Sequence, residues 1–181
     1  MKIVTKRLIL RELKKNDAKD IQVNANNIKI ARWIPPFPFP YSIKDANSYV
    51  KSCIKNSKKK PRETYDFGIT LKSEKNVVGT ISLSSVDKFQ GTGMLGYWLG
   101  EKHWRNGYMQ EALKEMIDFS FSKVKLRRID ISAFSDNDAS NKLIRKMGFK
   151  YEGTRIKQVR DKATKKIHDH DFYGILKENW K

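Results

Sequence analysis

The strongest constraint on the fold is a change in hydrophobic spacing in the middle of the chain. At Tyr65–Leu71 apolar residues occupy every second position, which predicts a β-strand with one buried face. A similar run at Val77–Val86, after a polar turn, predicts an antiparallel hairpin, and Met94–Leu99 predicts another strand. From Ala112 to Val124 the apolar residues recur at intervals of three and four, which is typical of a helix packed on a sheet.

The segments before this region predict one more strand and two helices. The alternation at Ile3–Leu13 predicts a first strand. Asp17–Asn24 predicts a short helix opened by an Asn or Asp cap. Ile43–Lys55 predicts a longer helix, and Ser42 is a suitable N-cap for it.

The segments after it predict three strands and a helix. Arg128–Phe134 alternates as a strand, and Phe149–Arg160 and Ile167–Leu176 predict the last two strands. Asp138–Met147 predicts a helix that ends at Gly148, a residue suited to a left-handed cap. Its inward side chains are expected to be Ala139, Leu143, Ile144 and Met147. Residues 1–181 are therefore expected to form a single α+β domain, with a mixed, mostly antiparallel, twisted sheet of about seven strands flanked by helices.

The segment Trp33–Tyr41 holds four of the five prolines of the chain. Proline lacks a backbone N–H and fixes its own φ, so this segment is predicted to be a loop. Its aromatic residues have two interpretations. They either shape a pocket or cap the hydrophobic core.

Composition says more about where the protein is located in the cell than about its chemistry. The 181 residues include one cysteine, Cys53, and no apolar run long enough for a membrane span, so we expect a cytoplasmic protein without a membrane role. Thirty-eight Lys and Arg residues against 20 Asp and Glu leave a net charge of +18. This excess attracts phosphates on nucleic acid, lipid or a cofactor, and it equally fits a lysine-rich background.

The joint between Met94–Leu99 and the following helix is a candidate phosphate site. The first N–H groups of a helix have no intrahelical acceptors and lie at the positive end of the helix dipole. Such an end binds phosphate readily. Asn106 and Gly107 permit the left-handed backbone that would turn these N–H groups toward a pyrophosphate.

The chain resembles the GCN5-related N-acetyltransferase (GNAT) family, in particular its ribosomal-protein N-terminal acetyltransferase (RimJ/RimL-like) branch. The resemblance rests on an ordered set of motifs rather than on any one of them. In chain order these are Thr5–Arg11 (Thr-x-Arg-Leu-x-Leu-Arg), Gly96–Leu99 (Gly-Tyr-Trp-Leu), Trp104–Met109, Asn137–Ser140, Gly148-Phe149, Glu152-Gly153, His168 or Asp169 to Tyr173, and Glu178–Trp180.

The resemblance implies splayed central strands that hold acetyl-CoA as the acetyl donor, with no metal. The backbone of Trp98 and Leu99 would bind the pantetheine arm, and Asn137 would bind it from the other side. The pyrophosphate loop would consist of Arg105, Asn106, Gly107, Tyr108, Met109 and Gln110. Met109 and Arg105 depart from the family pattern, which prefers smaller residues there, so we expect Met109 to point into the core.

The implied reaction is direct attack of an amine on the thioester, with an N–H near Leu99 stabilising the oxyanion. Ser140 is the candidate proton donor to the departing thiol, and its alternative role is a backbone contact in the first turn of its helix. Neither Glu152 nor Glu111 is a convincing general base. His168 and His170 are expected on one face of a strand, without the further ligands that zinc needs.

The absence of a strong base favours an acceptor that loses its proton easily. An α-amino group has a pKa of about 7.8 and a lysine amine about 10.4, which makes a lysine about 3.5 kcal/mol harder to deprotonate. We therefore expect a protein or peptide N-terminus as acceptor. The resemblance to the ribosomal-protein branch further implies a position near the ribosome, and a monomer or homodimer is expected. The alternatives are a small-molecule amine acetyltransferase and a basic protein that binds RNA or the ribosome without catalysis.

Overall fold

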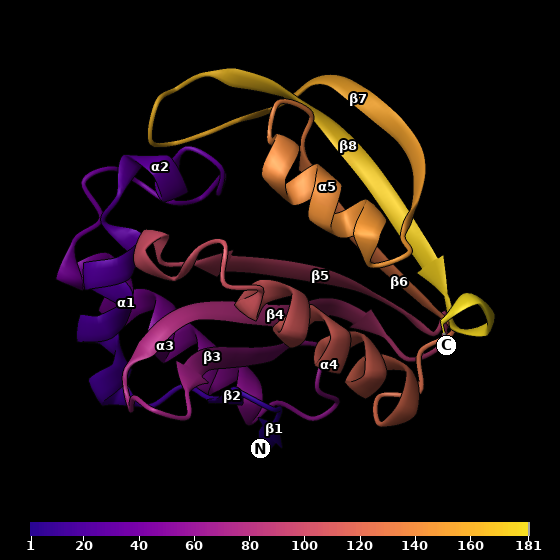
Figure 1. The fold of residues 1–181 in the computed structure, drawn as a ribbon, viewed down its shortest axis with the longest axis horizontal. Helices are drawn as coiled ribbons and strands as arrows, with labels where there is room; N and C mark the ends of the chain where they lie inside the picture. Colours follow the sequence, from indigo (N-terminus) through magenta and orange to yellow (C-terminus); the bar gives the residue numbers. More distant parts are fainter. Residues whose placement is uncertain (181) are drawn as a thin grey trace.

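One sheet of eight strands runs through the structure, a computed structural model that describes residues 1–180 (Figure 1). The strand order is β1-β2-β3-β4-β5-β6-β8-β7, and every neighbouring pair is antiparallel except β5 and β6. The strands are β1 (Lys2–Val4), β2 (Leu8–Glu12), β3 (Tyr65–Leu71), β4 (Val77–Asp87), β5 (Thr92–Leu99), β6 (Arg128–Phe134), β7 (Lys150–Arg160) and β8 (Ile167–Leu176). The predicted mixed α+β sheet is confirmed.

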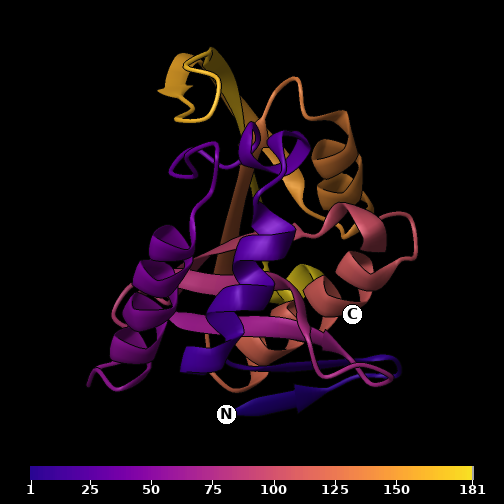
Figure 2. The same cartoon turned by 90° about the vertical axis from the view of Figure 1, so that its left-hand side faces the viewer.

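Helices cover both faces of the sheet (Figure 2). The helices are α1 (Ala18–Ala25), α2 (Ile28–Ala31), α3 (Ile43–Ser57), α4 (Tyr108–Ser122) and α5 (Asp138–Lys146), with single 3-10 turns at Lys15–Asp17, Glu101–His103 and Lys177–Asn179. Figure 2 shows α3 on one side of the strands and α4 and α5 on the other. Within residues 1–180 no helix combines the length and apolar character that crossing a membrane requires.

The N-terminal strand differs from the prediction. Residues 3–13 were expected to form one strand, but they contribute to two, β1 and β2, which pair as a hairpin. The turn between them is set by Thr5, whose N–H donates to the carbonyl of Leu8 at 3.0 Å and whose hydroxyl accepts from the N–H of Leu8 at 2.8 Å. Threonine hydroxyls commonly close turns in this way, which alternation of side chains does not reveal. The sheet therefore has eight strands rather than about seven.

The helix predictions are right in place and partly wrong in capping. Ser42 caps α3 as expected, because its hydroxyl accepts from the N–H of Asp45 at 3.2 Å. Asp17 precedes α1 but does not cap it; its carboxylate pairs with Arg11 at 2.8 Å instead. The one-turn helix α2 was not predicted, and Asn27 caps it by accepting from the N–H of Lys29.

Helix α5 also carries one correction. Ile144 and Met147 are buried and Leu143 is half-buried, as predicted, and Gly148 has the left-handed φ of 88°. Ala139, however, is exposed rather than inward. Asn141 is buried in this part of the helix, where its amide donates to the carbonyl of Phe134 at 3.0 Å.

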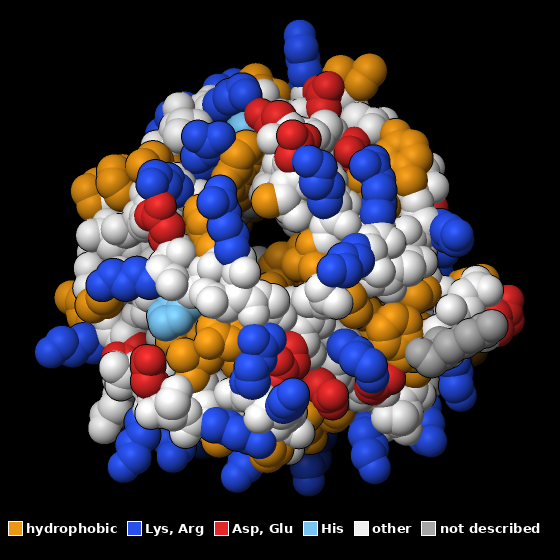
Figure 3. Space-filling view, viewed as in Figure 1, with side chains coloured by type: hydrophobic (Ala, Val, Ile, Leu, Met, Phe, Trp, Pro, Cys, Tyr) orange, Lys and Arg blue, Asp and Glu red, His pale blue; other side chains and the backbone are white. Residues whose placement is uncertain are grey.

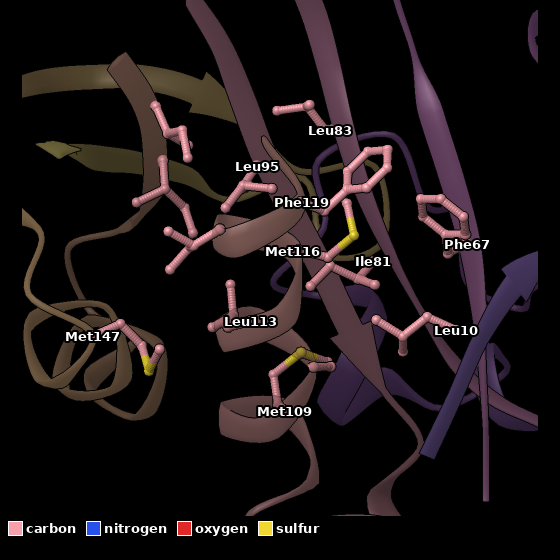
Figure 4. Packing of buried hydrophobic residues seen from close by; sticks show 14 of the residues in the cluster. Leu10, Phe67, Ile81, Leu83, Leu95, Met109, Leu113, Met116, Phe119 and Met147 are labelled. Atoms are coloured by element: carbon pink, nitrogen blue, oxygen red, sulfur yellow. The ribbon is translucent and has the colours of Figure 1, made fainter. Parts of the chain in front are cut away.

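Two hydrophobic clusters pack against the sheet. The larger lies between the strands and α4, and Figure 4 shows Met109 and Met116 of α4 on the side that faces Leu10 and Ile81. The second includes buried residues of α1 and α3, among them Val50. Both faces of the central strands are thus buried, which holds β5 firmly in place.

The sheet opens between β5 and β6. These strands pair from Thr92 and Arg128 as far as Leu95 and Ile131, and then separate. Beyond that point β5 stays paired with β4 up to Leu99, and β6 stays paired with β8 up to Phe134. Figure 1 shows the two halves of the sheet diverging here. We call the space between them the wedge.

Candidate active site

The wedge opens into a cleft of about 630 Å³. Figure 3 shows a hollow at the centre of this face with Lys and Arg side chains around its rim. All the predicted site residues except Asn106 line the cleft, namely Trp98, Leu99, Arg105, Gly107, Tyr108, Met109, Gln110, Asn137 and Ser140. Tyr97 and Trp104, which belong to the noted motifs but were given no site role, also line the cleft. Lining residues that the sequence did not indicate include His103, Ser132, Lys142 and Lys146.

The loop that enters α4 has the geometry of an anion site. Gly107 is the N-cap with a φ of 74°, a left-handed conformation that glycine adopts without strain. The N–H of Glu111 makes the first intrahelical bond, to the carbonyl of Gly107 at 3.1 Å. Across the described chain, no protein group accepts from the N–H groups of residues 108–110. Three free donors therefore lie at the positive end of α4.

The same loop is held by contacts with the N-terminal hairpin. Thr5 and Arg7 of the hairpin bond Asn106 of the loop and Glu111 of α4, and we call these four residues the clamp. The Nε of Arg7 donates to the Glu111 carboxylate at 2.7 Å, and Nη1 of Arg7 donates to the carbonyl of Asn106 at 2.9 Å. Burial raises the pKa of Glu111, but bonds from Thr5 and Arg7 outweigh this and hold it below its usual value. Glu111 thus ties the loop to the turn between β1 and β2. Asn106 contributes to the clamp rather than to the lining of the cleft.

The two departures from the family pattern are accommodated. Met109 is buried in the larger cluster, so its side chain points away from the free N–H groups, as expected. Arg105 is exposed at the rim with a φ of 62°. A long side chain at either position leaves the backbone donors of the loop accessible.

The alternation of β5 shows which backbone groups face the wedge. In an antiparallel pair, successive residues direct their N–H and C=O groups to opposite sides of the strand. The N–H of Gly100 donates to Val78 of β4 at 2.8 Å, so the backbone of Trp98 also faces β4 and that of Tyr97 and Leu99 faces the wedge. We expected Trp98 to offer its backbone to a ligand, but its backbone faces β4, and the backbone of Tyr97 faces the wedge instead.

Leu99 has one of its two wedge-facing groups occupied. Its carbonyl accepts from the indole Nε1 of Trp104 at 2.7 Å. The N–H of Leu99 and both backbone groups of Tyr97 remain for a ligand. Trp98 contributes its side chain, which is buried with Phe37 at a ring distance of 5.9 Å.

Two hydroxyl groups meet inside the cleft. The hydroxyl of Tyr97 on β5 lies 2.8 Å from that of Ser140 in the first turn of α5. The N–H of Ser140 donates to the side-chain oxygen of Asn137 at 3.3 Å, so Asn137 caps α5 and only its NH₂ group remains for a ligand. Burial raises the pKa of Tyr97 to about 12, so its hydroxyl keeps its proton at neutral pH.

Residues 7–150 match the family model described as acetyltransferase (GNAT) domain, which covers well over half of the chain. The chain belongs to the GNAT acetyltransferase family. It is an N-acetyltransferase, as are the relatives it resembles.

Over most of its length this acetyltransferase is 31% identical to the uncharacterized N-acetyltransferase YoaA of Bacillus subtilis, across 96% of this chain and 95% of that protein. It is 34% identical to the ribosomal-protein-serine acetyltransferase of Escherichia coli over 44% of this chain and 45% of that protein. A solved structure of RimL, described as a ribosomal L7/L12 alpha-N-protein acetyltransferase in complex with coenzyme A, superposes with a TM-score of 0.84 at 19% identity and covers 96% of each chain.

No carboxylate is among the described residues that line the cleft of this acetyltransferase. Its charged lining residues are Lys29, Arg105, Lys142 and Lys146, with His103 as the one histidine. Glu152 lies elsewhere and pairs with Arg128, whose hydrogen bond lowers the pKa of the carboxyl. This contact gives Glu152 a structural role in the sheet, since Arg128 lies on β6 and Glu152 on β7.

His168 is buried outside the cleft, with both ring nitrogens engaged. Nδ1 lies 3.1 Å from Asp136 and Nε2 lies 3.1 Å from Asp161, while the ring stacks on Phe134 at 4.1 Å. Burial lowers the pKa of the neighbouring His170. In the described chain, no group of three or more His, Cys, Asp and Glu side chains is arranged to hold a metal ion.

The loop of residues 33–41 serves both roles considered for it. Phe37 and Tyr41 are buried in the second cluster, whereas Trp33 and Ile34 line the cleft. The loop also touches the turn between β7 and β8, because the N–H of Lys162 donates to the carbonyl of Pro35 at 3.1 Å. We call this contact the bridge, and it ties the β7–β8 turn to the loop whose Trp33 and Ile34 line the cleft.

Proposed function

We propose that this acetyltransferase moves the acetyl group of acetyl-CoA to the α-amino group of a protein or peptide N-terminus. The observation that carries the donor half of this proposal is the continuity of free backbone groups in the cleft. They run from the N–H groups of residues 108–110 to Tyr97 and Leu99. A pyrophosphate joined to an amide-containing arm matches such a series of donors and acceptors.

Different residues of the chain would bind different parts of the donor. The N–H groups at the start of α4 would hold the pyrophosphate, and Arg105, Lys142 and Lys146 add positive charge around the rim. Tyr97 and Leu99 would bond the amides of the arm from one side of the wedge, and the NH₂ of Asn137 from the other. Coenzyme A in the complex of the similar RimL structure supports this choice of donor.

Catalysis then depends on alignment and on backbone dipoles rather than on a strong base. A neutral amine attacks the thioester carbonyl, and a wedge-facing N–H, from Tyr97 or Leu99, stabilises the negative charge that develops on the oxygen. The C–S bond breaks with its electron pair on sulfur, and the amine loses its extra proton to water. The chain supplies a fixed approach for both partners.

Two features support an α-amine as the acceptor. The cleft has no lining carboxylate to deprotonate a lysine, whose amine is about 3.5 kcal/mol harder to deprotonate than an α-amine. The bridge also ties the loop that carries Trp33 and Ile34 of the cleft to the β7–β8 turn, and the acceptor would enter through an opening bordered by this loop. A slender chain end fits this opening better than a lysine on a folded surface.

The names of the relatives support a ribosomal protein as acceptor. The similar proteins described as acetyltransferases of ribosomal proteins make a cytoplasmic location near the ribosome the setting we propose. We also propose that residues 1–181 act as one catalytic domain, as a monomer or a homodimer.

Release of free CoA thiol tests the proposal. The protein is incubated with acetyl-CoA and, separately, an N-terminal peptide, the same peptide with a blocked N-terminus and one lysine, and a small polyamine. We expect thiol release with the free N-terminus at a rate at least about 10-fold above the lysine peptide. Preference for lysine or polyamine contradicts the acceptor. No thiol release, with RNA binding that weakens steeply with salt, contradicts the enzymatic proposal.

A further inference from the structure

The hydroxyl pair of Tyr97 and Ser140 joins the two walls of the wedge. Tyr97 extends from β5, and Ser140 belongs to α5, which follows β6. Both line the cleft, and their oxygens are 2.8 Å apart. A serine in the first turn of a helix usually directs its hydroxyl to the local backbone. Here the hydroxyl meets a side chain from the facing strand instead.

Acidity favours Tyr97 as the donor of this hydrogen bond. Each hydroxyl carries one proton, so only one of the two donates in the pair and the other proton points elsewhere. A phenol is a stronger acid than an alcohol and therefore the better donor. The 2.8 Å separation of the oxygens fits either direction, and with Tyr97 as the donor the proton of Ser140 is left to point into the cleft.

We propose that Tyr97 is a positioning residue that aims the hydroxyl of Ser140 at the sulfur of the departing thiolate. This inference rests on the proposed acetyl-CoA chemistry and adds a role that the cleft alone does not assign. The hydrogen bond from Tyr97 polarises the Ser140 hydroxyl and makes it a better donor. The developing negative charge on sulfur is the acceptor.

The proton balance limits what Ser140 does. A thiol has a pKa of about 8.5, far below that of an alcohol, so Ser140 hydrogen-bonds the thiolate without giving up its proton. As the C–S bond breaks, the electron pair stays on sulfur, and the amine proton leaves with water. Solvent protonates the thiolate after release. Ser140 is therefore a hydrogen-bond donor rather than the general acid first expected.

The kinetic test uses Tyr97→Phe, which keeps the ring and removes only the hydroxyl. We expect kcat to fall about 3- to 10-fold, the scale of one neutral hydrogen bond, while the KM for acetyl-CoA stays within about 2-fold. Ser140→Ala should lower kcat further, and Tyr97→Phe in that background should add nothing, because the two groups act as a unit. Tyr151→Phe is the matched control, since its hydroxyl bonds Thr154 outside the cleft.

A titration of bound CoA tests the same inference without any acceptor. The ultraviolet absorbance of the thiolate is followed against pH for CoA bound to the wild-type protein, Tyr97→Phe and Tyr151→Phe. We expect the bound thiol to ionise at lower pH in the wild type and in Tyr151→Phe than in Tyr97→Phe. Cys53 is common to all three proteins and does not affect the comparison, because burial raises its pKa to about 12.

The outcomes separate the two proposals. If CoA binds and its thiol titrates alike in wild type and Tyr97→Phe, the positioning role is wrong and the proposed function stands. Additive losses of kcat in the double variant likewise assign Tyr97 a packing role. If CoA does not bind to the wild type at all, both proposals fall together.

Discussion

The loop that leads into α4 is tied to the N-terminal hairpin by several charged and polar contacts. The loop of residues 33–41 is instead tied to the β7–β8 hairpin by the bridge, one backbone hydrogen bond, and by the packing of Trp33 on His168 and of Ala163 on the second cluster. On the first side Thr5, Arg7 and Glu111 fix the backbone that would hold the pyrophosphate. On the second side Lys162 meets Pro35, and the network of His168 holds the hairpin itself. We propose that the donor binds on the first side, which we call the rigid side, and that the acceptor enters on the second, which we call the acceptor side.

Loss of the Arg7 side chain is the change expected to weaken the rigid side most. In Arg7→Met, the Glu111 carboxylate loses its only cationic partner among residues 1–180, beside the anion site, and repels the phosphates. We expect the Kd for CoA to rise about 10- to 100-fold, the scale of a charged hydrogen bond, with little change in kcat at saturation. Isothermal titration calorimetry measures this directly.

The control for Arg7→Met is Arg160→Met, on the acceptor side. Arg160 is also exposed and also donates to a backbone carbonyl, that of Lys165 at 2.7 Å. Its loss should leave CoA affinity unchanged. Equal losses of CoA affinity in the two variants would mean that positive charge in general, rather than the clamp, supports the cofactor.

A smaller loss of CoA affinity is expected when the backbone of the α4 loop is strained than when the clamp is broken. Gly107→Ala places a Cβ on a residue with a φ of 74°, which costs about 1–2 kcal/mol and should raise the Kd for CoA about 10-fold. Asparagine tolerates this conformation better, so Gly107→Asn should recover much of the affinity. The two variants together separate backbone strain from crowding, since Asn is the larger side chain. Weaker binding by Gly107→Asn than by Gly107→Ala would point to crowding.

On the acceptor side, Lys162→Pro removes the N–H that forms the bridge. We expect the rate on the blocked lysine peptide, relative to the N-terminal peptide, to rise about 3- to 10-fold, because the opening widens when one hydrogen bond is lost. Lys162→Ala keeps the N–H and should preserve the wild-type ratio. Thiol release with the two peptides gives the ratio. An identical ratio in both variants means that the bridge does not select the acceptor.

The two sides also differed in how far the sequence revealed them. The α4 loop was predictable, because Gly107 and the helix start at a strand end are local features that residue identity encodes. The bridge was not, since Pro35 and Lys162 are far apart in the sequence and meet only in the tertiary structure. The clamp lay between these cases: the motif Thr5–Arg11 was noted, but its pairing with Glu111 is a contact across more than a hundred residues.

Within the cleft, the sequence did not reveal which side chains and backbone groups face the ligand. The strand at Met94–Leu99 was predicted, but Trp98 rather than Tyr97 was assigned the ligand-facing backbone. That choice depends on which edge of β5 pairs with β4, and the register decides it. The prediction for Ala139 was wrong for a similar reason. Its side chain lines the cleft, and apolar spacing on a short helix does not distinguish a side chain that faces the cleft from one that faces the core.

The smallest expected effect concerns the acid stability of the acceptor-side hairpin. Burial raises the pKa of Asp161, but bonds from Thr164 and His168 lower it more, so its pKa in the folded state lies below the usual value. A carboxyl with a depressed pKa stabilises the fold above its unfolded pKa of about 3.9, and this contribution is lost as the pH falls further through the folded pKa. Urea denaturation should therefore give Asp161→Asn a free energy of unfolding about 1 kcal/mol lower than that of the wild type at pH 7. The difference between the two proteins should be smaller at pH 3.

Comparison with the rigid side decides what this acid effect means. Glu111 also has a depressed pKa, but it ties the α4 loop rather than the hairpin. If the acceptor side is the looser one, acid should raise amide hydrogen exchange at residues 161–168 before it does so at residues 105–111. Exchange measured at pH values stepping down from 5, corrected for the intrinsic rate, tests the order. Simultaneous loss of protection in both segments would show that the rigid side and the acceptor side unfold as one unit, and the bridge would then be as firmly held as the clamp.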